Sequence, residues 1–105
     1  MTLMTKEDAK MLPPLYSTEN IPMARKKVHI KFFSIFSNWT WYVVEGQQRE
    51  DGDFLFFGLV DGLEREWGYF TLRELESAKA MRGKLPLVEK DLYFKPTTIK
   101  KLGLV

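Results

Sequence analysis

The sequence predicts an α+β fold, with a four- or five-stranded antiparallel meander sheet, one packed helix and a short N-terminal helix. Two observations support this fold class. Four segments rich in aromatic and β-branched residues follow one another, with short turn sequences between them. Two threonine-led segments with helix-start signals flank these four segments. The length of 105 residues fits one domain, residues 1–105.

The short N-terminal helix is expected to begin at Thr5. Threonine is a favoured N-cap, and Asp8 places an acid in the first turn. Pro13 and Pro14 end the helix, because proline lacks an amide hydrogen and restricts the residue before it. Residues 15–24 are then expected to cross the surface without regular structure.

The predicted strands cover residues 27–36, 39–45, 53–60 and 66–70. The sequences Ser37-Asn38, Asp51-Gly52 and Asp61-Gly62 are typical of turns and separate the strands. Successive strands joined by such short turns are expected to pair as an antiparallel meander.

A second helix is expected to begin at Thr71, which forms a capping-box pattern with Glu74. The apolar residues that recur along it at helical spacing are Leu72, Leu75, Ala78 and Met81, and Gly83 is expected to end it. Residues 85–94 are expected to add an edge strand that Pro86 interrupts. Residues 98–102 are expected to form a last helical turn.

Both faces of the predicted sheet are apolar. The third strand presents Phe54, Phe56 and Val60 on one face and Leu55, Phe57 and Leu59 on the other. In one interpretation, residues 12–16 and 85–94 cover the second face and complete the core. In the other, an aromatic patch stays exposed and binds a partner or a second copy. The sequence leaves both interpretations open, and with them the choice between monomer and homodimer.

The composition excludes several classes of protein. The chain has no cysteine, which rules out disulfide scaffolds, thiolate zinc sites and a thiol nucleophile. No apolar run reaches the length of a membrane span, and residues 1–10 do not resemble a signal peptide. We therefore expect a cytoplasmic protein with no membrane association.

No catalytic or metal-binding motif is evident. His29 is the one histidine, and it lies between Lys27 and Lys31 without a nucleophile motif. The acids near Gly52 fail the spacing of a calcium-binding loop, and no glycine-rich phosphate loop is present. We expect a protein that is not an enzyme and has no cofactor and no metal.

Charge is unevenly distributed along the chain. Residues 45–76 contain nine acidic and three basic residues, whereas the segments on either side are basic, with net charges of +3 and +5. An acidic surface can occupy a basic groove on another protein. The residues predicted to bind a protein partner are the aromatic side chains Trp39, Trp41, Tyr42 and Trp67 and the acids Glu50, Asp51 and Asp53, since tryptophan and tyrosine are frequent interface anchors.

Binding of single-stranded nucleic acid is the alternative. Basic groups beside aromatic rings suit such a ligand, because phosphates attract cations and bases stack on rings. The residues predicted for this role are Arg25, Lys26, Lys27 and Lys31, which lie next to Phe32 and Phe33.

Several sequence blocks resemble one known family. They are Leu12-Pro13-Pro14-Leu15-Tyr16, Ser37-Asn38-Trp39-Thr40-Trp41-Tyr42, Phe56-Phe57-Gly58-Leu59-Val60, Gly68-Tyr69-Phe70 and Asp91-Leu92 with Phe94-Lys95-Pro96. They resemble a bacterial family of small proteins on plasmids and phages, known as domain of unknown function 2958. The resemblance implies a mobile genetic element as context and supplies no catalytic residues. By analogy of context, the expected partner is a host or mobile-element protein, and the sharpest form of the function is a counter-defence inhibitor of the anti-CRISPR or antirestriction type.

Overall fold

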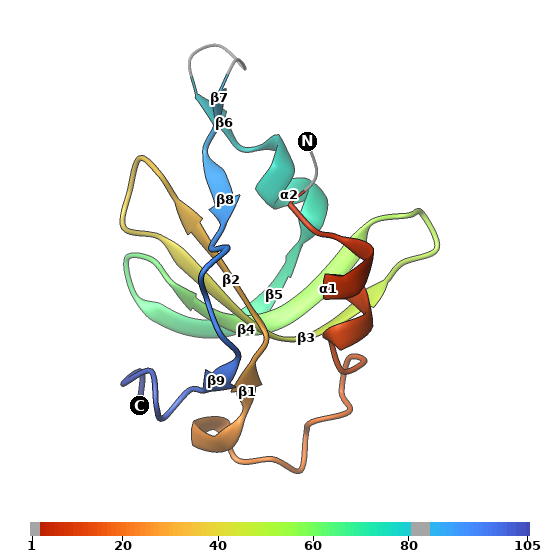
Figure 1. Ribbon diagram of the computed structural model, residues 1–105, viewed down its shortest axis with the longest axis vertical. Coiled ribbons are helices and arrows are strands. Elements are labelled where there is room, and N and C mark those ends of the chain that lie inside the picture. The colour runs from red at the N-terminus through yellow and green to blue at the C-terminus, as the bar shows by residue number, and fades with distance from the viewer. Residues whose placement is uncertain (1–2, 81–84) are drawn as a thin grey trace.

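A five-stranded antiparallel sheet forms the centre of this computed structural model, which describes residues 3–80 and 85–105 (Figure 1). The strand order is β5-β4-β3-β2-β8. The bounds are β2 Ile30–Ser34, β3 Thr40–Gln48, β4 Phe54–Asp61, β5 Arg65–Thr71 and β8 Val88–Lys90. Strands β2 to β5 pair in sequence order, and β8 returns to the outer side of β2. The predicted α+β meander is confirmed.

The remaining elements are short. They are α1 Lys6–Met11, the 3-10 helix η1 Met23–Arg25, β1 Lys27–Val28, α2 Leu72–Ser77, β6 Lys79–Ala80, β7 Leu85–Pro86 and β9 Thr97–Thr98. Strand β1 pairs with β9, and β6 pairs with β7. The predicted strand over residues 27–36 is therefore two strands with different partners. No helix in the described ranges is long and apolar enough to cross a membrane.

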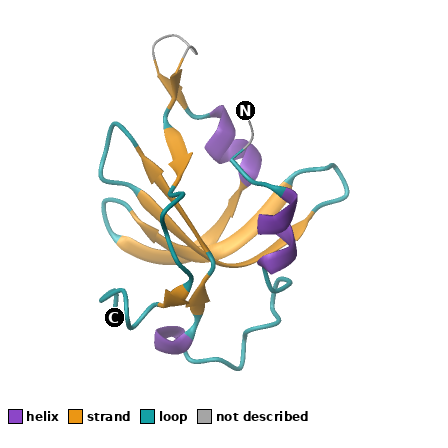
Figure 2. Ribbon diagram, in the orientation of Figure 1, coloured by secondary structure: helices purple, strands orange, loops and turns teal. Residues whose placement is uncertain are grey.

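The first face of the sheet carries the larger apolar cluster. Phe32 and Phe56 are its largest fully buried side chains. Both α-helices contribute to it, α1 through Ala9 and α2 through Leu75. Figure 2 shows these two helices in purple beside the sheet. Its buried members are Leu3, Leu12, Ile30, Phe32, Val43, Phe54, Phe56, Phe70, Leu75 and Val88. Leu12 and Val88 come from the two segments that were expected to cover the second face, but they pack on this first face instead, so that expectation is wrong for these two residues.

The second face carries a smaller cluster that the C-terminal segment covers. Its buried members are Val28, Val44, Leu59 and Ile99. Phe94, Leu102 and Leu104 pack against it from the C-terminal segment. The alternation read from β4 is thereby confirmed, because Phe54 and Phe56 lie in one cluster and Phe57 and Leu59 in the other.

The two helices begin where the sequence predicts. Thr5 and Asp8 form a capping box at α1, and Thr71 and Glu74 form one at α2. The Lys90 ammonium donates a 2.6 Å hydrogen bond to Asp8 and so ties α1 to the edge strand β8. Burial alone raises the pKa of Asp8, but its hydrogen bonds, that from Lys90 foremost, lower it more, and the pKa lies below its usual value.

The predicted end of the second helix is wrong. Helix α2 ends at Ser77, and Ala78 already has an extended backbone. The Leu87 amide donates to the Ala78 carbonyl oxygen, and β6 then pairs with β7. Tertiary pairing overrides helical spacing here. Met81 and Gly83, the other residues used in that prediction, lie outside the described residues.

In place of the predicted last helical turn, the chain forms turns, in which the Leu102 amide donates to the Thr98 carbonyl oxygen and the Gly103 amide to the Lys100 carbonyl oxygen. Residues 97–98 form strand β9 instead, because they pair with β1. The turn at Asp51-Gly52 is as predicted, and Gly52 has the positive φ of 88° that such a turn demands.

Candidate binding surfaces

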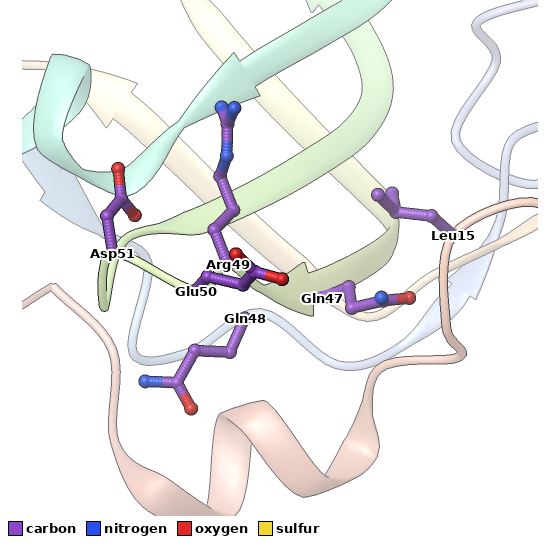
Figure 3. Close-up of a pocket in the computed structure, with 6 residues that line it drawn as sticks. All are labelled: Leu15, Gln47, Gln48, Arg49, Glu50 and Asp51. Atoms are coloured by element: carbon purple, nitrogen blue, oxygen red, sulfur yellow. The ribbon is translucent and has the colours of Figure 1, made fainter.

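The acidic turn predicted to bind a partner joins β3 to β4. Glu50 and Asp51 are exposed there and line an open hollow of about 480 Å³ with Leu15. The side chains around this hollow point in different directions (Figure 3), so they do not converge on one bound group. Arg73 forms a 3.5 Å ion pair with the Asp51 carboxylate and donates to its carbonyl oxygen at 2.7 Å.

Asp53, the third acid of this turn, is buried with 8% of its surface exposed. Its Oδ1 accepts hydrogen bonds from the amides of Arg73 at 3.0 Å and Phe54 at 2.8 Å. Burial alone raises the pKa of Asp53, but these two amides lower it more, and the pKa lies below its usual value. Asp53 therefore joins the turn to α2. Its contact with a partner stays a prediction, and the buried side chain offers little exposed area for such a contact.

Trp39 and Trp41 lie where two hairpin turns meet. Trp41 is half-buried against the first-face core, and its ring lies 6.0 Å from that of Trp39. Trp39 is 39% exposed and rests on Gly62 of the other hairpin, where an added methyl group would lie 2.7 Å from the indole. The β2–β3 and β4–β5 turns are therefore in contact.

We call the surface formed by Phe36, Trp39 and Leu63 the hairpin-tip patch. The three side chains line one hollow, and Phe36 is 58% and Leu63 93% exposed. Glu64 and Glu66 line the adjoining hollow beside Trp39 and Leu63. Within residues 3–80 and 85–105, no cation pairs with either carboxylate. The patch is apolar and its rim is acidic.

The sequence interpretation missed Phe36 and Leu63, because Phe36 was taken as the end of the strand over residues 27–36 and Leu63 is a single apolar residue beside a polar turn. The strand order contains a signal that identifies them. In a meander, every second turn lies at the same end of the sheet, so the turn after β2 and the turn after β4 must be neighbours. Apolar residues in both turns then form one surface.

Tyr42 and Trp67, the other two predicted anchors, lie half-buried on the second face. There Trp67 begins a row of rings that we call the aromatic row. Trp67 stacks on Phe57 at 5.6 Å, Phe57 lies 5.0 Å from Tyr69, and Tyr69 lies 6.3 Å from Tyr16. The row thus joins two strands of the sheet to the loop after α1.

At the end of the row formed by Tyr16 and Tyr69 lies a hollow of about 340 Å³, which we call the tyrosine pocket. Glu45 is buried in its wall and accepts hydrogen bonds from the amide of Tyr16 at 2.8 Å and from the amide and hydroxyl of Thr18. Lys26 is also buried, and its ammonium donates to the Thr18 carbonyl oxygen at 2.5 Å and hydroxyl at 3.0 Å. Thr18 therefore links a buried anion to a buried cation.

A β-bulge turns Glu45 toward this pocket. The β3–β4 register shifts between Val43 and Glu45, so Val43 faces Gly58 and Glu45 faces Phe57. The extra residue, Val44, packs in the second-face cluster, and Glu45 lies on the same face beside Phe57. Without the bulge, adjacent residues would point to opposite faces.

The four basic residues predicted for nucleic acid do not form one surface. Arg25 and Lys27 are exposed, but Lys26 is buried in the tyrosine pocket. Lys31 is half-buried, forms a 3.7 Å ion pair with Asp91 and lies 6.0 Å above the ring of Tyr42.

His29 is half-buried between β1 and β2, and its amide donates to the Val43 carbonyl oxygen at 2.9 Å. Burial and then the positive charge of Lys27 lower its pKa, so the ring is neutral at neutral pH. In the part of the chain that the structure describes, no three His, Asp or Glu side chains gather to hold a metal ion.

The fold and its surfaces define a small α+β domain with an apolar patch at one end of the sheet and an aromatic pocket on its second face. The model of one protein family, described as a protein of unknown function (DUF2958), matches residues 3–101. The chain belongs to this family, as the sequence blocks indicated. No curated protein and no solved structure matches the chain.

Proposed function

We propose that this protein acts by binding another protein through the hairpin-tip patch, without catalysing a reaction. The exposure of Phe36, Trp39 and Leu63 on one surface carries this proposal. Single exposed apolar residues are common, but a contiguous group of large ones is typical of an interaction site. Trp39 is a suitable anchor, because an indole buries a large area with few torsions to restrict.

The rim of the patch indicates the chemistry of the partner. Glu64 and Glu66 have no cationic partner among the described residues. Carboxylates at the edge of an interface favour a partner surface with lysine or arginine around an apolar pocket. The proposed partner is therefore a basic protein surface of the host or of the mobile element, and the site of action is the cytoplasm.

The biological part of the proposal rests on the family resemblance rather than on the fold. The protein is proposed to be an accessory factor of a mobile genetic element. Its sharpest form is a counter-defence inhibitor of the anti-CRISPR or antirestriction type, which blocks a host enzyme by occupying its basic groove.

The test compares two exposed leucines in an affinity capture from nuclease-treated bacterial lysate. Leu63→Asp changes the patch, whereas Leu92→Asp changes a leucine that is 79% exposed near the opposite end of β2. Both variants should keep their folding free energy within about 0.5 kcal/mol of the parent. If Leu63 is buried by a partner, its loss costs about 2 kcal/mol, or about 30-fold in affinity.

A host protein that the parent and Leu92→Asp both retain and Leu63→Asp loses would support the proposal. Equal capture by all three would refute the role of the patch. Light scattering of the purified protein tests a second copy as partner. A dimer that Leu63→Asp dissociates would make self-association the function of the patch.

Nucleic-acid binding is the second candidate, and one observation favours it. The fold brings the C-terminal lysines to η1, because the Lys100 amide donates to the Ala24 carbonyl oxygen at 2.9 Å. The exposed basic residues Arg25, Lys27, Lys100 and Lys101 therefore gather at one corner. In a titration with labelled single-stranded DNA, binding at this corner should weaken steeply with salt and be lost in Lys100→Glu. An affinity for single-stranded DNA that does not change with salt concentration would exclude this candidate.

A further inference from the structure

The tyrosine pocket combines aromatic walls with buried charge. Tyr16, Phe57 and Tyr69 form its walls, and Glu19, Glu45 and Lys26 also line it. A pocket with ring walls and a few convergent polar groups is typical of a binding site. Its place on the second face separates it from the hairpin-tip patch, which borders the first face.

The charge balance of the pocket is negative. Two carboxylates, Glu19 and Glu45, face one ammonium group, that of Lys26, and this ammonium already donates both of its described hydrogen bonds to Thr18. The same two carboxylates affect the pKa of the Tyr69 phenol. Partial burial raises its pKa, and the neighbouring Tyr16 phenol and the Glu45 and Glu19 carboxylates raise this pKa further. The pocket therefore favours a cation.

The aromatic walls favour a cation of a particular shape. Tyr16 and Tyr69 lie 6.3 Å apart with their planes inclined at 54°, and Phe57 is 5.0 Å from Tyr69. Rings arranged in this way attract an organic cation to their faces, and the apolar stem of an arginine or lysine packs well against the rest of the wall.

Tyr16 keeps a backbone conformation that tyrosine rarely adopts. Its φ is 70°, in the left-handed region that favours glycine. The Glu45 carboxylate holds this conformation by accepting from the Tyr16 amide. Such a conformation in a bulky residue is often retained at functional sites, and here the ring forms part of the pocket wall.

The sheet edge beside the pocket indicates how the cation arrives. Tyr69 lies on β5, the last strand in the sheet order, and among the described residues no strand pairs with the outer edge of β5. An extended segment that pairs with this edge would place every second side chain on the second face, next to Trp67 and Tyr69.

We propose that the tyrosine pocket receives an arginine or lysine side chain from an extended segment of the partner protein, which adds to the edge of β5. The cation lies against Tyr16 and Tyr69 and near the carboxylates of Glu19 and Glu45. This proposal rests on the proposed function of protein binding and gives the partner a second contact, distinct from the hairpin-tip patch.

The probe for this proposal is a short extended peptide with one central arginine between threonine and valine residues, followed by NMR titration of the isotope-labelled protein. The matched probe carries citrulline, which has the shape of arginine without its charge. The arginine peptide should shift the resonances of Tyr16, Tyr69 and the β5 amides. The citrulline peptide should bind about tenfold more weakly.

Two variants test the pocket itself. Tyr16→Gly removes the ring, relieves the left-handed backbone and keeps the amide that donates to Glu45. The unfolding midpoint of this variant should therefore not fall. Its affinity for the arginine peptide should fall about fivefold. Glu19→Gln should weaken binding about threefold. Tyr93→Gly removes a ring that is 92% exposed and does not line the pocket, and it should change nothing.

Equal binding of the arginine and citrulline peptides, absence of binding by either, or unchanged binding in Tyr16→Gly would overturn the proposal. Equally tight binding of free N-acetyl-arginine amide would also overturn it, because a free organic cation would then be the ligand. Leu63→Asp should leave peptide binding intact, so the pocket and the hairpin-tip patch can fail independently.

Discussion

Substitution of Gly58 tests whether the bulge in β3 depends on a missing side chain in β4. A Cβ at Gly58 would lie 2.9 Å from the Tyr42 carbonyl carbon, closer still to its oxygen, and 3.1 Å from the Val43 Cα. These are backbone atoms of a central strand, so no side-chain rotation relieves the clash. Gly58→Ala must push β3 and β4 apart next to the bulge that turns Glu45 toward the tyrosine pocket.

The expected destabilisation follows from this contact. Overpacking a core costs about 1–3 kcal/mol, and the rigid partners place Gly58→Ala near 3 kcal/mol. For a domain of this size that corresponds to a fall of roughly 12–24 °C in the unfolding midpoint. Gly68 is the matched control, because it lies directly opposite Gly58 on β5 and an added Cβ there meets nothing within 4 Å. Gly68→Ala should stabilise the fold by about 0.5 kcal/mol, since it restricts the unfolded chain.

Urea unfolding followed by circular dichroism measures both variants. Amide NMR of Gly58→Ala should also show changed resonances at Glu45 and Thr18, because the bulge places the Glu45 carboxylate on Thr18. Equal unfolding free energies for the two variants would refute the reasoning, as would a stable Gly58→Ala with unchanged resonances in the pocket.

Three further predictions concern the first face. Lys90→Met removes the cation that helps to keep the pKa of Asp8 low. The free energy of unfolding of the parent should fall as the pH drops from about 5 to about 2, because the Asp8 carboxylate is then protonated. Urea unfolding across that range should show a smaller fall in the variant. Phe56→Ala empties a fully buried site and should cost about 4 kcal/mol in the same assay. Gly62→Ala should displace the ring of Trp39 and shift its indole resonance with less destabilisation than Gly58→Ala, because a partly exposed ring can move.

Local signals in the sequence predicted most of the fold. The capping boxes at Thr5 and Thr71 and the turn at Gly52 are determined by residues within a few positions of one another. Alternation along β4 assigned its residues to the correct faces. The early end of α2 was not predictable in this way, because it depends on the pairing of β6 with β7 and not on the residues of the helix.

The candidate surfaces were less predictable, since each depends on contacts between distant segments. Trp39 was identified as an aromatic interface anchor on the predicted strand 39–45, but its neighbour Leu63 belongs to another hairpin. The tyrosine pocket was missed because a bulge, which leaves no clear mark in the sequence, changes the face of Glu45. Lys26 was predicted as a surface cation and is buried, because its ammonium is held by Thr18.

The structure also changes the interpretation of the acidic block of residues 45–76, because most of its acids already have partners within the chain. Six of its nine acids have partners within the chain: Glu45 and Asp53 accept hydrogen bonds from backbone amides, Asp51 and Asp61 pair with arginines, Glu74 caps α2, and Glu76 accepts a hydrogen bond from the Leu3 amide. Among the described residues, the acids without such a partner are Glu50, Glu64 and Glu66. Two of these three flank the hairpin-tip patch, whereas Glu50 lies at the β3–β4 turn.

Within the acidic block, the carboxylates placed to steer a partner toward the hairpin-tip patch are therefore Glu64 and Glu66. Reversing both charges, as Glu64→Lys with Glu66→Lys, should slow association with the captured partner about tenfold at low salt and leave dissociation nearly unchanged. Glu50→Lys is the control and should have little effect. Surface plasmon resonance at two salt concentrations measures both rates. A double variant that associates as fast as the parent would show that the acidic rim does not steer binding, and a slower Glu50→Lys would move the interface to the β3–β4 turn.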